Sequence, residues 1–354
     1  MILQGDLVVL FHGPDVFDLG HAKSLMGKLG DARFFQAGTM GRTAAHDNGL
    51  ENIVTIPDLP GKVVARSTEI GSLIIAICPR TRDSGKSFVK IIMENSGIKA
   101  PLMHLDFSNK TFVIWQGDFE KELLERIRDM GFSEDMPKTS ANRFERRGGA
   151  ITRKLSDCKV GDFVLCSNIL IGTATSPNVS ITVEKGRITH TEGISVKPHG
   201  VEKLERLGPI DILGTKCCST SNLRGDNVAP RVTVSDGAGV VFINHAGSEV
   251  YELSEGCEGA LVVGDDTSRI VGDILYRFEM PIIAITDGDR DGLIKHDRFT
   301  EGSVVFKVDH DDDVGEHLYQ KLFNKSEKLD MPFEAVKEKV HSIICNRVKE
   351  CRVY

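Results

Sequence analysis

The sequence has little that would mark a membrane protein, a secreted protein or a dedicated nucleic-acid binder. Its 354 residues contain no run of about 18 apolar residues, so we expect no transmembrane helix and no membrane partner. The first residues lack a basic segment before their apolar run, which predicts a first strand instead of a signal peptide, and hence a cytoplasmic protein. The net charge of −7 supplies no excess of Lys and Arg for phosphate contacts, which argues against nucleic acid as a partner.

Cysteine spacings typical of metal or redox centres are also missing. None of the eight cysteines belongs to a C-x-x-C motif, and Cys217 and Cys218 are adjacent, a spacing that rarely forms a disulfide. Because no export signal is present, we expect reduced thiols that pack as small apolar residues.

The composition and the order of apolar segments predict a folded α/β protein of several domains. Hydrophobic residues make up 40% and charged residues 27%, and the length exceeds that of one ordinary domain. Apolar runs alternate with amphipathic stretches near both ends of the chain, which favours mainly parallel sheets covered by helices. We predict an N-terminal sheet domain over 1–137, a basic linker over 138–154, a β-rich middle over 155–257 and an α/β domain with a C-terminal helix over 258–354.

Two features mark the middle of the chain. Alternating apolar and polar residues predict two hairpins, one around Lys185–Gly186 and one around Asp236–Gly237. The linker before them could grip a polyanion, although a solvated linker is the simpler interpretation. Its basic residues are Arg143, Arg146, Arg147, Arg153 and Lys154.

Acidic residues follow three successive strands predicted near the C-terminus, at 260–264, 281–286 and 303–308. The strand ends carry Asp265 and Asp266, then Asp287, Asp289 and Asp291, then Asp309, His310 and Asp311. Ligands of open α/β sheets bind at the carboxyl ends of the strands, so these side chains are expected at one edge. Gathered carboxylates repel one another unless a cation neutralises them, and oxygen ligands favour Mg²⁺ or Mn²⁺. The alternative is that each Asp only caps a helix or forms a turn.

The segment around Asp287 matches two motifs to different degrees. An EF-hand needs Glu at its twelfth loop position, where Arg298 stands, and a helix before the loop, where a β pattern occurs. The stretch IIAITDGDRDG resembles instead the Asp-x-Asp strand end of a Toprim domain, the metal-binding module of topoisomerases and primases. That resemblance implies Asp287 and Asp289 as metal ligands, with Asp291 beside them.

The resemblance to Toprim domains departs at the preceding strand end. Those enzymes have a general acid–base Glu at this strand end, and this chain has none. Asp265 or Asp266 would take its catalytic position, so cleavage of a nucleic-acid strand is in doubt. Haloacid-dehalogenase-type phosphatases also use Asp-x-Asp, but there the motif comes first, so a circular permutation would be needed.

The N-terminal block has strand-end loops of the opposite charge. Glycines let the backbone approach an anion, and Arg or Lys adds positive charge, which predicts an anion site. Its candidate residues are Gly38, Gly41, Arg42, Arg80, Arg82 and Lys86, with His12 as a neighbouring proton carrier. A P-loop is excluded because Arg80 stands where its first Gly is needed, and ordinary solvated turns are the alternative.

The chain as a whole resembles one family. The stretches LFHGPDVFDLG, QAGTMGRTAAHDNGLE, GTATSPNVSITVEKGRI, KPHGVEKLE and VVGDDTSRIVGDILYRFEMPIIAITDGDRDG are similar to an uncharacterised archaeal family found chiefly in methanogens. The resemblance implies a cytoplasmic archaeal protein and assigns no catalytic residue.

These observations together predict a protein that holds Mg²⁺ or Mn²⁺ and a phosphorylated small molecule or nucleotide. Phosphoryl transfer or hydrolysis would be the chemistry of such a site. A non-catalytic binding or assembly protein with a structural ion is the first alternative, and a nucleic-acid-processing Toprim protein is the second. Whether the chain is an enzyme stays open at this point.

Overall fold

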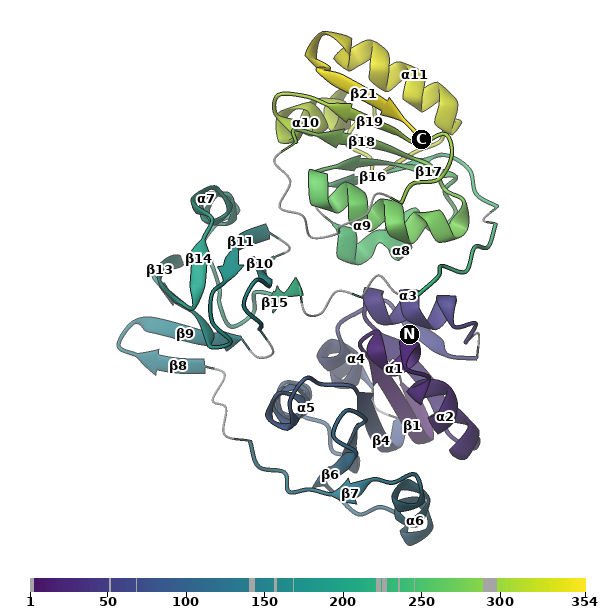
Figure 1. Ribbon diagram of the computed structural model, residues 1–354, viewed down its shortest axis with the longest axis vertical. Coiled ribbons are helices and arrows are strands. Elements are labelled where there is room, and N and C mark those ends of the chain that lie inside the picture. Colours follow the sequence, from purple (N-terminus) through teal and green to yellow (C-terminus); the bar gives the residue numbers. More distant parts are fainter. Residues whose placement is uncertain are drawn as a thin grey trace. The chain divides into compact units, whose positions relative to one another are not determined.

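The chain folds into two compact units, Met1–Val228 and Ala229–Tyr354. The computed structural model describes residues 3–50, 52–67, 69–139, 144–155, 158–167, 169–220, 224, 228–234, 236–244, 246–288 and 298–354. Figure 1 colours both units along the sequence and labels their elements. The fold is mixed α/β, as the sequence predicts.

The first unit begins with a seven-stranded sheet in the order β3-β2-β1-β4-β5-β6-β7. The five strands from β3 to β5 are parallel, and β6 runs antiparallel to β5. From the middle of the sheet, successive strands are added outward from β1 to β3 on one side and from β4 to β5 on the other. In a doubly wound sheet, the ligand-binding crevice lies at the carboxyl ends of the two strands where the order changes side, here β1 and β4. The strands are β1 (Gln4–His12), β2 (Arg33–Ala37), β3 (Val54–Ile56), β4 (Glu69–Ile77), β5 (Leu102–Asp106), β6 (Thr111–Gln116) and β7 (Ser133–Glu134).

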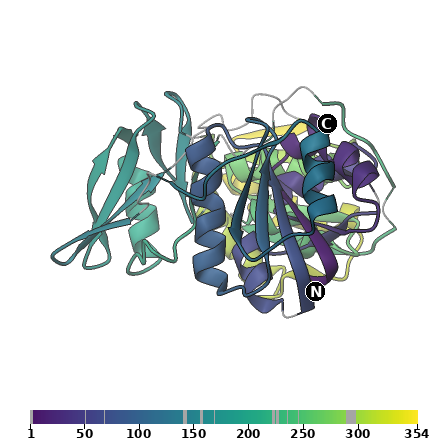
Figure 2. The ribbon, with the colours of Figure 1, turned by 90° about the horizontal axis from the view of Figure 1, so that it is seen from below.

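Helices cover both faces of this sheet, because its central strands are apolar on both sides. Val9 and Phe11 of β1 pack in one core with α2, α3 and α6, whereas Val8 and Leu10 pack in another with α4 and α5. Figure 2 shows α5 and α6 on opposite sides of the strands. The helices are α1 (Asp15–Asp18), α2 (His21–Lys28), α3 (Thr39–Asp47), α4 (Pro60–Arg66), α5 (Arg82–Ser96) and α6 (Lys121–Asp129).

Two four-stranded antiparallel sheets make up the rest of the first unit, in the orders β14-β11-β10-β15 and β13-β12-β9-β8. The predicted hairpin around Lys185–Gly186 is confirmed: it joins β12 to β13, and both turn residues have positive φ, 51° and 76°. The elements are β8 (Phe144–Arg147), β9 (Ala150–Leu155), β10 (Phe163–Cys166), β11 (Ile169–Ala174), β12 (Val179–Glu184), β13 (Arg187–Glu192), β14 (Ile194–Val196), α7 (Pro198–Arg206) and β15 (Cys217–Ser219).

The prediction of a linker is wrong over 144–154, where β8 and β9 pair as an antiparallel hairpin. Arg153 is only 5% exposed and donates hydrogen bonds to the backbone oxygens of Ile212 (3.1 Å) and Cys217 (3.4 Å). The guanidinium of Arg153 is therefore buried inside the first unit, so it is not accessible to a polyanion. Of the other basic residues, Arg143 lies outside the described part of the chain.

The second unit is one six-stranded sheet in the order β20-β16-β17-β18-β19-β21. Its four central strands are parallel, and an antiparallel strand closes each edge. The strands are β16 (Val240–Asn244), β17 (Gly259–Val263), β18 (Ile282–Thr286), β19 (Val304–Lys307), β20 (Lys328–Leu329) and β21 (Glu350–Val353). The hairpin predicted around Asp236–Gly237 is wrong, because Val240–Asn244 pairs in parallel with β17 instead of folding back on the preceding residues.

Helices again cover both faces, with α8 and α9 on one side and α10 and α11 on the other (Figure 1). Val314 of α10 and Val340 of α11 share a core with alternate residues of the strands, such as Val263 and Ile285. The helical elements are η2 (Gly247–Glu249), α8 (Val250–Ser254), α9 (Asp265–Leu275), η3 (Tyr276–Phe278), α10 (Asp311–Lys321), α11 (Phe333–Ile344) and η4 (Cys345–Arg347).

Candidate functional site

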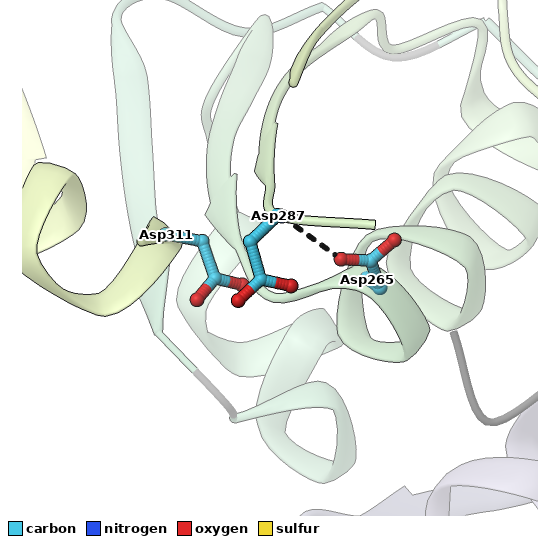
Figure 3. A group of neighbouring side chains, drawn as sticks. All are labelled: Asp265, Asp287 and Asp311. Atoms are coloured by element: carbon cyan, nitrogen blue, oxygen red, sulfur yellow. Dashed lines mark hydrogen bonds between the residues drawn. The ribbon is translucent and has the colours of Figure 1, made fainter. Parts of the chain in front are cut away.

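Three neighbouring parallel strands of the second unit end in acidic residues at the same edge. Asp265 follows β17 as the first residue of α9, Asp287 follows β18, and Asp311 follows β19 as the first residue of α10. Figure 3 shows their carboxyl groups close together, and one oxygen of each lies within 4.8 Å of the other two. The expectation that acidic strand ends meet is confirmed for these three residues.

Asp265 is hydrogen-bonded to the adjacent strand end. Its Oδ2 accepts hydrogen bonds from the backbone N–H groups of Asp287 (3.1 Å) and Gly288 (3.0 Å), and α9 has no side-chain cap. The N-cap residue of α9 is Gly264, so Asp265 is the first helical residue and does not itself occupy the capping position. The two bonds instead fix this carboxylate against β18.

The spacing of the three carboxylates suits a divalent cation. Oxygens bound to one Ca²⁺ are up to about 5 Å apart, and those bound to one Mg²⁺ up to about 4 Å. The observed limit of 4.8 Å is thus within reach of either ion after small side-chain rotations. Asp311 is only 8% exposed, so bulk water solvates its carboxylate poorly, and a negative charge there needs other stabilising groups.

The remaining acidic candidates lie around this cluster. Asp266 is half-buried in the first turn of α9, next to Asp265. Asp309 is exposed and pairs with Lys349, whose proximity holds the pKa of that carboxyl below its usual value. His310 is the N-cap residue of α10. Asp289 and Asp291 lie outside the described residues, so the Asp-x-Asp spacing of the Toprim resemblance stays a prediction.

A pocket of about 300 Å³ adjoins Asp265 on the side of α9. Besides Asp265, its charged lining residues are Arg269 of α9, Lys307 of β19, and Glu350 and Arg352 of β21, and the last two pair with each other (2.7 Å). Lys307 is opposite Thr286 in the sheet, and its ammonium lies close to Gly288, the residue after Asp287. Sequence reasoning missed Lys307, although its position at the end of the third acidic strand was a usable signal.

Ser268 is a second residue of the pocket that the sequence did not single out. It lies three residues after Asp265 on α9, hence on the same face of the helix. Its side chain is 2% exposed, and its hydroxyl has no hydrogen-bond partner within the described part of the chain. A buried hydroxyl left without a partner is uncommon and calls for a ligand or water.

The candidate anion residues of the first unit follow different strands of its sheet. Gly38, with φ of 100°, is the N-cap of α3 after β2, and Gly41 is buried beneath it against Gln36. His12 ends β1 between these loops, where its Nδ1 contacts the Ala37 carbonyl (3.0 Å) and its ring stacks on Phe88. Burial lowers the pKa of His12, so this imidazole is neutral near pH 7.

The basic residues of that set are largely engaged elsewhere. Arg80 pairs with Asp162 (3.2 Å), and Lys86 is 9% exposed and pairs with Asp135 (2.8 Å). Arg82 is exposed in the first turn of α5, and Arg42 is half-buried on α3. The anion site of the first unit stays a prediction from the sequence.

The fold and the site define a two-unit α/β protein with an acidic strand-end cluster and an adjoining pocket lined by charged residues of both signs. Residues 9–326 match the family described as "Uncharacterized protein conserved in archaea (DUF2117)", and the chain belongs to that family. A relative in Methanocaldococcus jannaschii, the uncharacterized protein MJ0065, is 30% identical over 350 residues, covering 91% of this chain and 95% of that protein.

Among solved structures, the GsuK channel bound to NAD is a weak match to this chain. The identity is 11% and the TM-score 0.22, with 92% of this chain and 64% of the channel chain covered, so the likeness carries no argument about fold or ligand. Across the described residues, no helix combines the length and the apolar character that a membrane crossing requires.

Proposed function

We propose that the second unit binds a divalent cation through Asp265, Asp287 and Asp311 and holds a phosphorylated ligand in the adjoining pocket. The observation that carries the proposal is the convergence of three carboxylates from three adjacent strands within 4.8 Å. Three negative charges at that separation repel one another, and a bound cation removes the repulsion. Mg²⁺ or Mn²⁺ fits the all-oxygen ligand set.

Two basic residues of the adjoining pocket support a phosphorylated ligand. Arg269 and Lys307 line the same pocket as Asp265, so a phosphate there would touch both the cation and these side chains. A cation shared in this way neutralises phosphate charge and orients water. Asp266, which is not one of the three proposed ligands, would accept the proton of a water whose oxygen bonds to phosphorus while the bond from phosphorus to the leaving oxygen breaks, so phosphoryl transfer or hydrolysis is the chemistry proposed.

Thermal unfolding with and without metal tests the cation site. We expect Mg²⁺ or Mn²⁺ at a hundredfold excess over its Kd to stabilise the wild type by about 2.7 kcal/mol, and EDTA to reverse the effect. Asp287→Asn removes one ligand and should abolish most of that shift. Without metal, the same variant should melt at a higher temperature than the wild type, because one repelling charge is gone.

Asp313→Asn is the matched control, since Asp313 is exposed in the same first turn of α10 as Asp311. It should respond to metal as the wild type does. Melting curves that are identical with metal and with EDTA in all three proteins would contradict the cation site.

Lys307→Met tests the phosphate part of the site. With inorganic phosphate as the probe and Mg²⁺ present, we expect about tenfold weaker phosphate binding, because one charged hydrogen bond contributes about 1.5 kcal/mol. The Mg²⁺ shift itself should persist in this variant. Lys321→Met, an exposed lysine of α10, is the control. Equal phosphate titrations for wild type and Lys307→Met would remove Lys307 from the site.

A further inference from the structure

Two cysteines far apart in the sequence meet in the first unit. Cys166 of β10 and Cys217 of β15 are directly opposite each other in an antiparallel pair, and their Sγ atoms are 2.8 Å apart. Cys166 is 0% and Cys217 5% exposed. All eight cysteines carry free thiols in the structure. We propose that Cys166 and Cys217 are the site of an intramolecular disulfide.

The ladder around the pair has the geometry that a cross-strand disulfide needs. Ser167 donates its backbone N–H to the Lys216 carbonyl (2.8 Å), so Ser167 and Lys216, the residues next to the two cysteines, are a hydrogen-bonded pair of the ladder. The pattern alternates along antiparallel strands, so Cys166 and Cys217 form the closer pair, with Cα atoms about 4.5 Å apart. That separation lies within the disulfide range of about 4.4–6.8 Å.

Neighbouring contacts keep β15 in this register. Arg153 of β9 donates hydrogen bonds to the backbone oxygens of Ile212 and Cys217, which lie before and on β15. Cys218, the next residue, is opposite Leu165 and faces the other side of the strand. Cys218 is therefore not positioned to bond to Cys166 in place of Cys217, and its substitution provides a control.

The reaction needs an oxidant, for which we name a small-molecule disulfide. The thiolate of one cysteine attacks a sulfur of that disulfide and releases one small thiolate. The second cysteine, after losing its proton, attacks the protein sulfur of the mixed disulfide and expels the other small thiolate. The two protons go to the released thiolates, so two cysteine thiols are oxidised and one small disulfide is reduced to two thiols.

Burial decides when this exchange takes place. The hydrogen bond between the two thiols and their burial raise the pKa of Cys166, so little reactive thiolate forms once the sheet has closed. We therefore expect the bond to form as the chain folds and to resist reducing agents afterwards. Archaeal proteins from hot habitats include intracellular examples with disulfides, so membership of an archaeal family is compatible with the bond.

Counting thiols in denaturant tests the proposal independently of the cation site. The full chain is refolded with an oxidised small-molecule disulfide, unfolded and alkylated, and its intact mass is measured. We expect six of the eight cysteines to be alkylated, and all eight after prior reduction. Peptide mapping should join the peptides of Cys166 and Cys217.

Two variants make the outcome specific. Cys166→Ala should leave all seven remaining cysteines alkylated, whereas Cys218→Ser should retain the cross-link and show five. Reduction should lower the Tm of the wild type by several degrees and leave that of Cys166→Ala unchanged. Eight alkylated cysteines in the refolded wild type, a lasting mixed disulfide, or a bond between other cysteines would each overturn the proposal.

Discussion

Asp273→Ala is expected to lower the free energy of unfolding of the second unit by about 3–5 kcal/mol, because it removes the acidic partner of a buried ion pair. Asp273 lies on α9, the helix that begins with Asp265. Its Oδ2 is 2.9 Å from Nη1 of Arg277, a side chain only 2% exposed, and its Oδ1 accepts a hydrogen bond from Arg298 (2.7 Å). One carboxylate therefore joins α9 to two cationic side chains.

Chemical denaturation of the variant and of a matched control measures this effect. Glu125→Ala removes an i,i+4 ion pair of the same type, Lys121–Glu125, whose side chains are 89% and 58% exposed. That control should cost no more than about 0.5 kcal/mol. If both variants lost the same small amount, the buried network would not stabilise α9 in the way we infer.

Acidification from pH 6.5 to pH 4 is expected to destabilise the first unit by about 3 kcal/mol through His104 alone. Burial lowers the pKa of His104 to about 4 from its ordinary value of 6.5, with the Lys86 ammonium as a further cause. Between these values the unfolded chain binds a proton that the folded chain does not. Stability from this group is therefore complete above pH 6.5 and is lost as the pH falls toward 4.

The only tryptophan of the chain reports on the same group. Trp115 donates its indole N–H to Nδ1 of His104 (2.9 Å), a bond that requires the neutral ring. Unfolding free energies should be compared at pH 7 and pH 4 for wild type, His104→Gln and His190→Gln, the last being an exposed histidine. Only His104→Gln should lose this part of the pH dependence. An unchanged pH profile in that variant would refute the assignment.

The acidic cluster was predictable from the sequence because two general rules applied together. A short apolar run with β-branched residues predicts a buried strand, and the carboxyl ends of parallel strands share an edge. The acidic strand-end residues, with Asp265, Asp287 and Asp311 among them, could therefore be grouped before their positions were known, but these three could not be selected from the group. The adjoining pocket could not, because Glu350 and Arg352 reach it from β21, an antiparallel edge strand with no clear periodic signal.

Local sequence determined whether most segments form a helix or a strand, whereas the tertiary structure determined which strands pair with one another. The residues at 144–154 look like a polar linker, yet Arg153 becomes buried by backbone oxygens more than 50 residues away. Val240–Asn244 follows an Asp-Gly pair that suggests a hairpin, yet its apolar side chains are buried on both faces of a parallel sheet. Long-range burial outweighed the local turn preference there.

The sequence by itself determined the α/β class, the strands that end in acidic residues and the oxygen-only character of the site. Only the tertiary structure decided which carboxylates meet, that Lys307 and Ser268 lie beside them, and that Cys166 faces Cys217. The physical reason is that propensity and periodicity act over a few residues. Contacts between side chains depend on strand order and register, which burial fixes across the whole unit.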